Sequence, residues 1–261
     1  MCTLIALHRC VPGAPLVVAA NRDEYFDRPA RPPALRQGPG GPLAAPLDQR
    51  AGGTWLGLNP DGLFAGLTNR PCQRPDAARR SRGLLVLDAL GARSAEEAAE
   101  RLRRLPAGAY NPFNLLLADG REAFALVYQE GPRLLELAPG AHVIGNADPD
   151  DRSVPKLAAL MDRAEAAARG AATQLLPALG RLCRRHDGGE GPLGPPCVHT
   201  ETYGTRSSTL LRLAEDERAD AWRYADGPPC TTRYRDFTPL LAALRRSASP
   251  RAGERGERKA S

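Results

Sequence analysis

The second residue of the chain, Cys2, would combine a nucleophile and a base on one residue once Met1 is removed. Removal of the initiator methionine is expected when a small residue follows it, and it would leave Cys2 with a thiol and a free α-amine. An α-amine titrates near ~7.7–8.0 and can act as a base close to neutral pH, whereas a thiol, near ~8.5, is readily activated. The alternative is that Cys2 is a small apolar residue of a buried strand, as free cysteines often are.

Four consecutive polar residues, Asn21-Arg22-Asp23-Glu24, directly follow the apolar run 16–20. If that run is the hairpin partner of an apolar first strand, these residues lie close to the chain start. The charge of Arg22 could then lower the pKa of the Cys2 thiol, and Asp23 could hold and orient the α-amine. The alternative is an ordinary hydrophilic loop at the end of a strand.

Five further short blocks follow in order and extend this pattern along most of the chain. They are Gly53-Thr54-Trp55-Leu56-Gly57, Thr68-Asn69, Ser81-Arg82-Gly83, Phe113-Asn114-Leu115 and Tyr203-Gly204-Thr205-Arg206-Ser207-Ser208-Thr209. On these blocks the chain resembles the NRDE-motif family, also called the transport-and-Golgi-organisation family, up to about residue 238. That family is in turn similar to the N-terminal-nucleophile (Ntn) hydrolases with a leading cysteine, including the choloylglycine hydrolases and penicillin V acylases, which cleave linear amide bonds.

The resemblance implies an α+β fold of Ntn-hydrolase type, an αββα four-layer sandwich in which antiparallel sheets are covered by helices. It also implies a catalytic set made of Cys2, Arg22, Asp23, Asn69, Asn146 and Arg206, with the two asparagines near the oxyanion. The order of residues 21–24 is permuted relative to those acylases, so the roles of Arg22, Asp23 and Glu24 are not assigned among them.

Three further residues, Asn21, Glu24 and Trp55, are expected to contact the substrate. Three of the predicted site residues also have an alternative, because an asparagine at position 69 or 146 suits a turn and Trp55 suits the core. The implied activity is hydrolysis or transfer of an acyl group from a small amide or thioester. The alternative is a non-catalytic carrier for haem or a lipid-like metabolite. The chain has no Cys-x-x-Cys-His segment, so haem would be bound as cargo and non-covalently; no cofactor is expected otherwise.

The elements that must position these residues follow from apolar periodicity and turn signals. Residues 2–9 and 16–20 predict one hairpin, and residues 54–58 and 63–68 predict a second around Asn59-Pro60-Asp61-Gly62. Residues 29–53 are rich in proline and glycine and predict a loop. Strands are further expected at 113–118, 123–128, 134–137, 207–213, 221–224 and 231–237, and helices at 81–90, 95–105, 154–168, 173–184 and 240–245. Segregated runs of this kind favour antiparallel sheets over a βαβ repeat. One domain is expected over 1–248, with a disordered charged tail over 249–261.

Composition excludes several classes of function. The net charge is +6, but 34 of the 36 basic residues are arginines spread among 30 acidic residues, which argues against a nucleic-acid groove. No apolar run reaches the roughly 18–20 residues of a membrane span, so a soluble protein is expected. The six cysteines form no Cys-x-x-Cys pair and are irregularly spaced, which favours a cytoplasmic protein with reduced thiols over a secreted disulfide scaffold, and the expected partner is a small-molecule substrate. Four residues, Cys183, His186, Cys197 and His199, could supply zinc ligands, but their irregular spacing favours a chain without metal.

Overall fold

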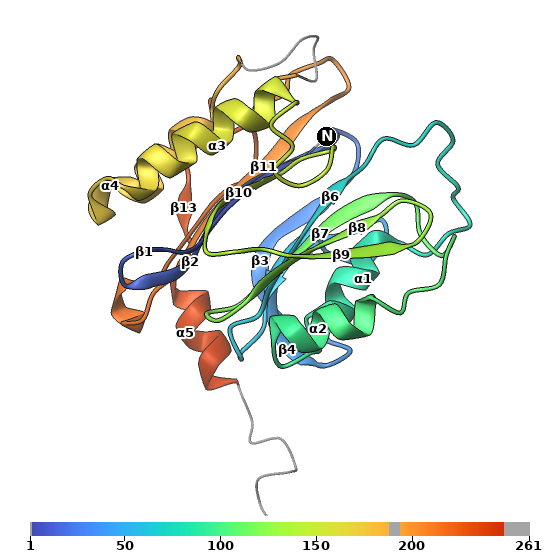
Figure 1. Cartoon of the computed structure of the whole chain (residues 1–261), viewed down its shortest axis with the longest axis horizontal. Helices are drawn as coiled ribbons and strands as arrows, with labels where there is room; N and C mark the ends of the chain where they lie inside the picture. The colour runs from blue at the N-terminus through green and yellow to red at the C-terminus, as the bar shows by residue number, and fades with distance from the viewer. Residues whose placement is uncertain (1, 188–193, 248–261) are drawn as a thin grey trace, which may run out of the picture.

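The computed structural model describes residues 2–187 and 194–247, and two antiparallel sheets stacked face to face form its centre (Figure 1). The first sheet has the order β10-β1-β2-β11-β12-β13 and the second the order β3-β4-β5-β6-β7-β8-β9. The strands of the first sheet are β1 (Thr3–Val11), β2 (Ala14–Tyr25), β10 (Gly140–Ile144), β11 (Tyr203–Leu213), β12 (Ala221–Ala225) and β13 (Arg235–Asp236). Those of the second are β3 (Ala30–Gly38), β4 (Gly41–Asp48), β5 (Leu56–Leu58), β6 (Phe64–Asn69), β7 (Phe113–Ala118), β8 (Ala123–Tyr128) and β9 (Pro132–Glu136).

Helices cover the outer face of each sheet, which gives the predicted αββα arrangement (Figure 1). Helices α3 (Pro155–Ala168) and α4 (Ala172–Cys183) pack on the first sheet, and α1 (Arg82–Ala89) and α2 (Ala95–Leu102) pack on the second. The last helix, α5 (Pro239–Arg246), packs against β3 and β4, and a short 3₁₀ helix, η1 (Glu217–Ala219), precedes β12.

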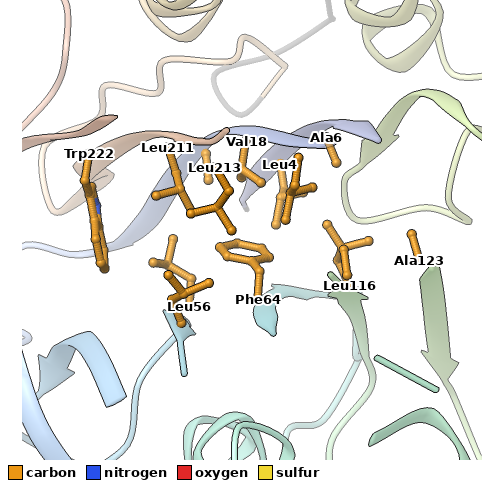
Figure 2. Close-up of a cluster of buried hydrophobic side chains, with 14 of the residues drawn as sticks. Leu4, Ala6, Val18, Leu56, Phe64, Leu116, Ala123, Leu211, Leu213 and Trp222 are labelled. Carbon is orange, nitrogen blue, oxygen red and sulfur yellow. The ribbon is translucent and has the colours of Figure 1, made fainter. Parts of the chain in front are cut away.

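The space between the sheets is filled by apolar side chains, because strand residues point alternately to opposite faces. From β1, Leu4 points into this interior while Ile5 points outward and packs under α3 and α4. Figure 2 shows Leu4 and neighbouring side chains of the first sheet facing Phe64, which comes from β6 of the second sheet. Strands β1 and β2 are therefore buried on both faces, which explains why their sequences read as continuous apolar runs.

The prediction of a loop over residues 29–53 was wrong, since β3 and β4 form a hairpin there. Prolines argue against central strands, but β3 is an edge strand, where a missing N–H group is tolerated. The pairing with β4 also shifts between Arg31 and Ala34, so Pro32 and Pro33 fall on the irregularity. Two other predicted elements were too long: α2 ends at Leu102, and the last strand consists of Arg235–Asp236. The predicted tail over 249–261 lies outside the described residues.

Candidate active site

The amino end of β1 places Cys2 beside the carboxyl half of β2. In the β1–β2 pairing Thr3 lies opposite Asn21, so Cys2, one residue earlier, is adjacent to Arg22. On its other side β2 pairs with β11, where Thr205 lies opposite Asp23. The hairpin predicted from the apolar runs therefore brings the chain start and the four polar residues together.

A cavity of about 390 Å³ opens at this end of the sandwich and contains most of the predicted site. Six of the nine predicted site residues line it: Cys2, Arg22, Asp23, Glu24, Trp55 and Asn69. They come from both sheets, because Asn69 ends β6 and Trp55 precedes β5. Residues more than forty positions apart in the chain thus share one polar wall.

The carboxylate of Asp23 is held on one side and unpaired on the other. Its Oδ1 accepts a hydrogen bond of 2.6 Å from the Thr205 hydroxyl, whereas Oδ2 is buried with no partner among the described residues. Burial raises the pKa of Asp23 from 3.8 to about 6, against the opposing effects of the positive charge of the chain's amino terminus, the Thr205 hydrogen bond and the charges of Lys156 and Arg22. An unpaired oxygen of this kind can accept a hydrogen bond from an ammonium group.

The sulfur of Cys2 is 3.9 Å from the backbone carbonyl oxygen of Asp23, and 7% of the residue is exposed. Burial raises the pKa of the thiol, because a thiolate is poorly solvated there, and the charge of Asp23 also raises it. The positive charge of the chain's amino terminus lowers the thiol pKa, and the charge of Arg22 does so to a smaller extent. A base close to the sulfur is therefore needed for the thiolate to form near neutral pH.

The guanidinium of Arg22 is fixed by two contacts. It stacks on the ring of Trp55, with 4.3 Å between the guanidinium carbon and the ring centroid, and it lies 3.7 Å from a carboxylate oxygen of Glu24. Its Nη1 has no hydrogen-bond partner among the described residues although it is buried. Trp55 lines the cavity and also packs against the apolar core, so both sequence-based expectations for it hold.

The remaining three predicted residues, Asn21, Arg206 and Asn146, are not among those that line this cavity. The side chain of Asn21 donates to the backbone carbonyls of Cys183 (2.8 Å) and Pro196 (2.9 Å), so it ties β2 to α4 and to the segment before β11. Arg206 occupies an irregularity of β11, between the residues that pair with Asp23 and Arg22.

Asn146 lines a neighbouring cavity of about 430 Å³ and donates a hydrogen bond to the backbone carbonyl of Asn69. A second bond across the two sheets runs from the Thr68 hydroxyl to the carbonyl of Gly145 at 2.6 Å. The side chain of Asn114 adds a third, also to the Gly145 carbonyl, at 3.1 Å. The carboxyl ends of β6 and β10 are thus joined by polar contacts beside Cys2.

Glycines allow the second sheet to approach α1 closely at the cavity wall. A Cβ atom on Gly53 would lie 2.3 Å from the carbonyl carbon of Gly83, and the backbone N–H of Thr54 donates to the carbonyl of Gly83 at 3.1 Å. The block Gly53–Gly57 and the block Ser81–Gly83 are therefore in direct contact, which accounts for their glycines in physical terms.

Several charged residues of the site were not identified from the sequence. Arg28 forms an ion pair of 2.5 Å with Asp48, and both residues line the cavity. Arg82 also lines it, and its position in one of the sequence blocks was an available signal. Lys156 is buried and donates to the carbonyl of Pro195 at 3.1 Å, and its ammonium is near enough to lower the pKa of Asp23. The one feature of the sequence that could have drawn attention to Lys156 is that lysine is rare in this chain.

Comparisons with known proteins agree with this architecture. Residues 1–222 match the family described as Transport and Golgi organisation 2. A Bos taurus protein, Transport and Golgi organization protein 2 homolog, is 31% identical over 240 residues, covering 77% of this chain and 83% of that protein. A Mus musculus homolog is 35% identical over 144 residues, covering 51% of this chain and 50% of that protein.

Two solved structures with the Ntn-hydrolase fold superpose on the chain. A mutant of conjugated bile acid hydrolase from Clostridium perfringens gives a TM-score of 0.53 at 12% identity, over 92% of this chain and 93% of that one. The Caenorhabditis elegans ortholog of N-acylethanolamine-hydrolyzing acid amidase gives 0.52 at 14% identity, over 80% and 92%. The predicted fold class is therefore confirmed. Within the described residues, every helix is too short or too polar to cross a membrane.

Proposed function

The chain belongs to the Transport and Golgi organisation 2 family, and from this premise we propose that it hydrolyses or transfers an acyl group from a small amide or thioester, with Cys2 as the nucleophile. The observation that carries the proposal is that Cys2, Arg22 and Asp23 line one cavity at the end of the first sheet. Removal of Met1 would add an α-amine to Cys2 on the wall that holds the unpaired carboxylate oxygen of Asp23.

The proposed reaction has two halves. The α-amine takes the thiol proton, and the thiolate forms a sulfur–carbon bond with the acyl carbonyl. The bond from that carbon to the leaving nitrogen or sulfur then breaks, and the α-ammonium returns the proton to the leaving group. Water, deprotonated by the same amine, adds to the acyl carbon, the sulfur–carbon bond breaks, the α-ammonium returns the proton to the sulfur, and a carboxylic acid leaves. In this scheme Asp23 orients the amine, and Arg22 stabilises the thiolate.

Amide side chains from the second sheet and from β10 supply the oxyanion donors in this proposal. Asn69 lines the cavity, and a donated hydrogen bond there would stabilise the negative oxygen of the tetrahedral intermediate. Asn146 uses one amide hydrogen on the backbone of Asn69, which leaves the second available as a donor. Arg206 remains a predicted catalytic residue that acts through its charge.

The charge of the cavity wall favours an anionic substrate. Six arginines and four carboxylates line it: Arg22, Arg28, Arg50, Arg79, Arg80 and Arg82 against Asp23, Glu24, Asp48 and Asp76. In the described part of the chain Arg82 forms no ion pair and donates to the carbonyl of Pro112 at 2.9 Å. We therefore expect a substrate with a carboxylate or phosphate group that the arginine side chains can bind.

The alternative function is a carrier for haem or a lipid-like metabolite without turnover. None of the four histidines is among the described residues that line the Cys2 cavity. His8, for example, lines a separate cavity, and His142 is held by Asp150 at 2.6 Å and by the carbonyl of Ala138 at 2.7 Å. The polar wall and the position of the histidines favour acyl transfer over transport of an apolar cargo.

Labelling by an acyl thioester tests the proposal. Intact mass first establishes whether Met1 has been removed; the processed protein is then treated with an acyl thioester and an N-acyl amide, and its peptides are mapped. We expect one acyl group on the Cys2 peptide of wild type and of the control Cys10→Ser, and none after Cys2→Ala. A processed wild type that stays unlabelled, but gives a Soret band with haem that survives Cys2→Ala, would establish the carrier instead.

A further inference from the structure

Two histidines and two cysteines that the proposed reaction does not use meet in loops beside the first sheet. His186 follows α4, Cys197 and His199 precede β11, and Cys230 lies between β12 and β13. The ligand atoms of these four side chains all lie within 4.8 Å of one another. We propose that they bind one zinc ion in a structural Cys₂His₂ site.

The spacing of the ligand atoms suits a tetrahedral zinc ion. Zinc–sulfur and zinc–nitrogen bonds of about 2.3 and 2.0 Å at tetrahedral angles place the ligand atoms roughly 3.3–3.8 Å apart. The two sulfurs are 3.6 Å apart, and Nε2 of His199 is 3.6 Å from the sulfur of Cys197 and 3.1 Å from that of Cys230. A disulfide, by contrast, requires a sulfur–sulfur distance of about 2.05 Å.

The surroundings of the cluster also favour a closed structural site. Nδ1 of His186 is 3.2 Å from the backbone carbonyl oxygen of Cys197, and a hydrogen bond donated there leaves Nε2 to bind the metal. Histidines that bind zinc usually donate their second ring N–H group in this way. Two thiolates and two neutral imidazoles balance the charge of Zn²⁺, and four protein ligands leave no open position for substrate.

This set differs from the one that the sequence suggested. The thiol of Cys183 lies in the apolar layer under α4, and the hydroxyls of Ser208 and Tyr234 are its polar neighbours. Cys230 takes its place, although it is 33 residues from Cys197 in the chain. The zinc ion would therefore join two loops that are distant in sequence.

The proposed zinc site holds the segment that supports the acidic residue of the cavity. Immediately before the first cysteine ligand, the carbonyl of Pro196 accepts from Asn21, the neighbour of Arg22 on β2. Immediately after it, the N–H group of Val198 donates at 2.9 Å to the Thr205 hydroxyl, which in turn donates to Asp23. The metal would therefore help to position β2 through Pro196 and Val198, without contacting the substrate.

Metal content of the full-length protein tests the inference. The chain is produced in zinc-supplemented medium, treated briefly with EDTA and analysed by elemental mass spectrometry. We expect about one zinc per chain in wild type, Cys10→Ser and Cys183→Ser, and under about 0.1 in Cys197→Ser and Cys230→Ser. Zinc retained by Cys230→Ser but lost from Cys183→Ser would overturn the ligand set.

Cobalt gives a second readout that does not depend on whether the variants fold. Wild type reconstituted with Co²⁺ should show the intense visible bands of tetrahedral cobalt and a sulfur-to-cobalt charge-transfer band. A wild-type chain that holds neither metal, or a peptide map that shows a disulfide between Cys197 and Cys230 in the freshly purified protein, would refute the site.

Discussion

Replacing Asp23 with asparagine should change the pH dependence of stability by an amount that follows from its burial. The pKa of Asp23 in the folded chain is about 6, against an ordinary value of 3.8, and each unit is worth ~1.36 kcal/mol. Between these two values the native protein keeps a proton that the unfolded chain has lost. The stability that the protonated Asp23 contributes is therefore fully present below pH 3.8 and is lost as the pH rises through 6. Over this pH interval the free energy of unfolding of the wild type should fall by about 3 kcal/mol relative to that of Asp23→Asn, which does not titrate.

The assay is urea denaturation of both proteins at a series of pH values from about 3.5 to 7. It is best done first on chains that retain Met1, produced with methionine aminopeptidase inhibited, because Cys2 then has no free amine. Any fixed cost of the new amide group is the same at every pH and cancels. A difference that does not vary with pH would refute the burial argument. In the protein without Met1, the α-ammonium should pair with the Asp23 carboxylate and reduce the pH-dependent difference in unfolding free energy between wild type and Asp23→Asn. If that difference stays at about 3 kcal/mol, the pairing is refuted.

Three further predictions concern the cavity and its supports. Asn69→Ala should lower the acyl-transfer rate about 10²–10³-fold with a small change in KM, as loss of an oxyanion donor does, and steady-state kinetics would show it. Thr205→Val removes the hydrogen bond that lowers the pKa of Asp23, so the acid limb of the pH–rate profile should move to higher pH; an unshifted limb would argue against an ionised Asp23 in the reaction. Gly53→Ala would place a Cβ 2.3 Å from backbone of α1 and should cost about 1–3 kcal/mol in denaturant unfolding, whereas Gly131→Ala, with open space around it, should cost little.

Site residues were predicted best from the sequence where a short local pattern also determines which residues meet in the folded chain. The apolar runs before Asn21 and after Met1 fix the β1–β2 hairpin, and the register of that hairpin brings Cys2 to Arg22 and Asp23. The family resemblance made Asn69 a candidate site residue, and the turn signal and apolar run that delimit β6 located it at the end of that strand. The meeting of Cys2 with Arg22 and Asp23 needed one hairpin, and hairpins are encoded locally, whereas Asn69 reaches the same cavity through the stacking of the two sheets.

What could not be predicted depends on contacts between distant segments. The β3–β4 hairpin was missed because a proline at a sheet edge and a proline in a loop look the same until the strand order is known. Lys156 and Cys230 have no periodic or motif signal, and they acquire neighbours because α3 and the β12–β13 connection fold back on the first sheet. Asn146 could be placed near the site, but its bond to the backbone of Asn69 required the packing of the two sheets.

The polar bonds between β6 and β10 have a consequence for how the protein can change over generations. Most of the interface between the sheets is apolar, and apolar contacts have no preferred direction, so one aliphatic side chain can replace another if the sheets shift slightly. At Thr68, Asn69, Asn114 and Gly145 the spacing is instead set by hydrogen bonds of definite length. Tolerance of substitution should therefore fall along the sandwich from the far end to Cys2, so that the interior can diverge while the reacting groups keep their separation.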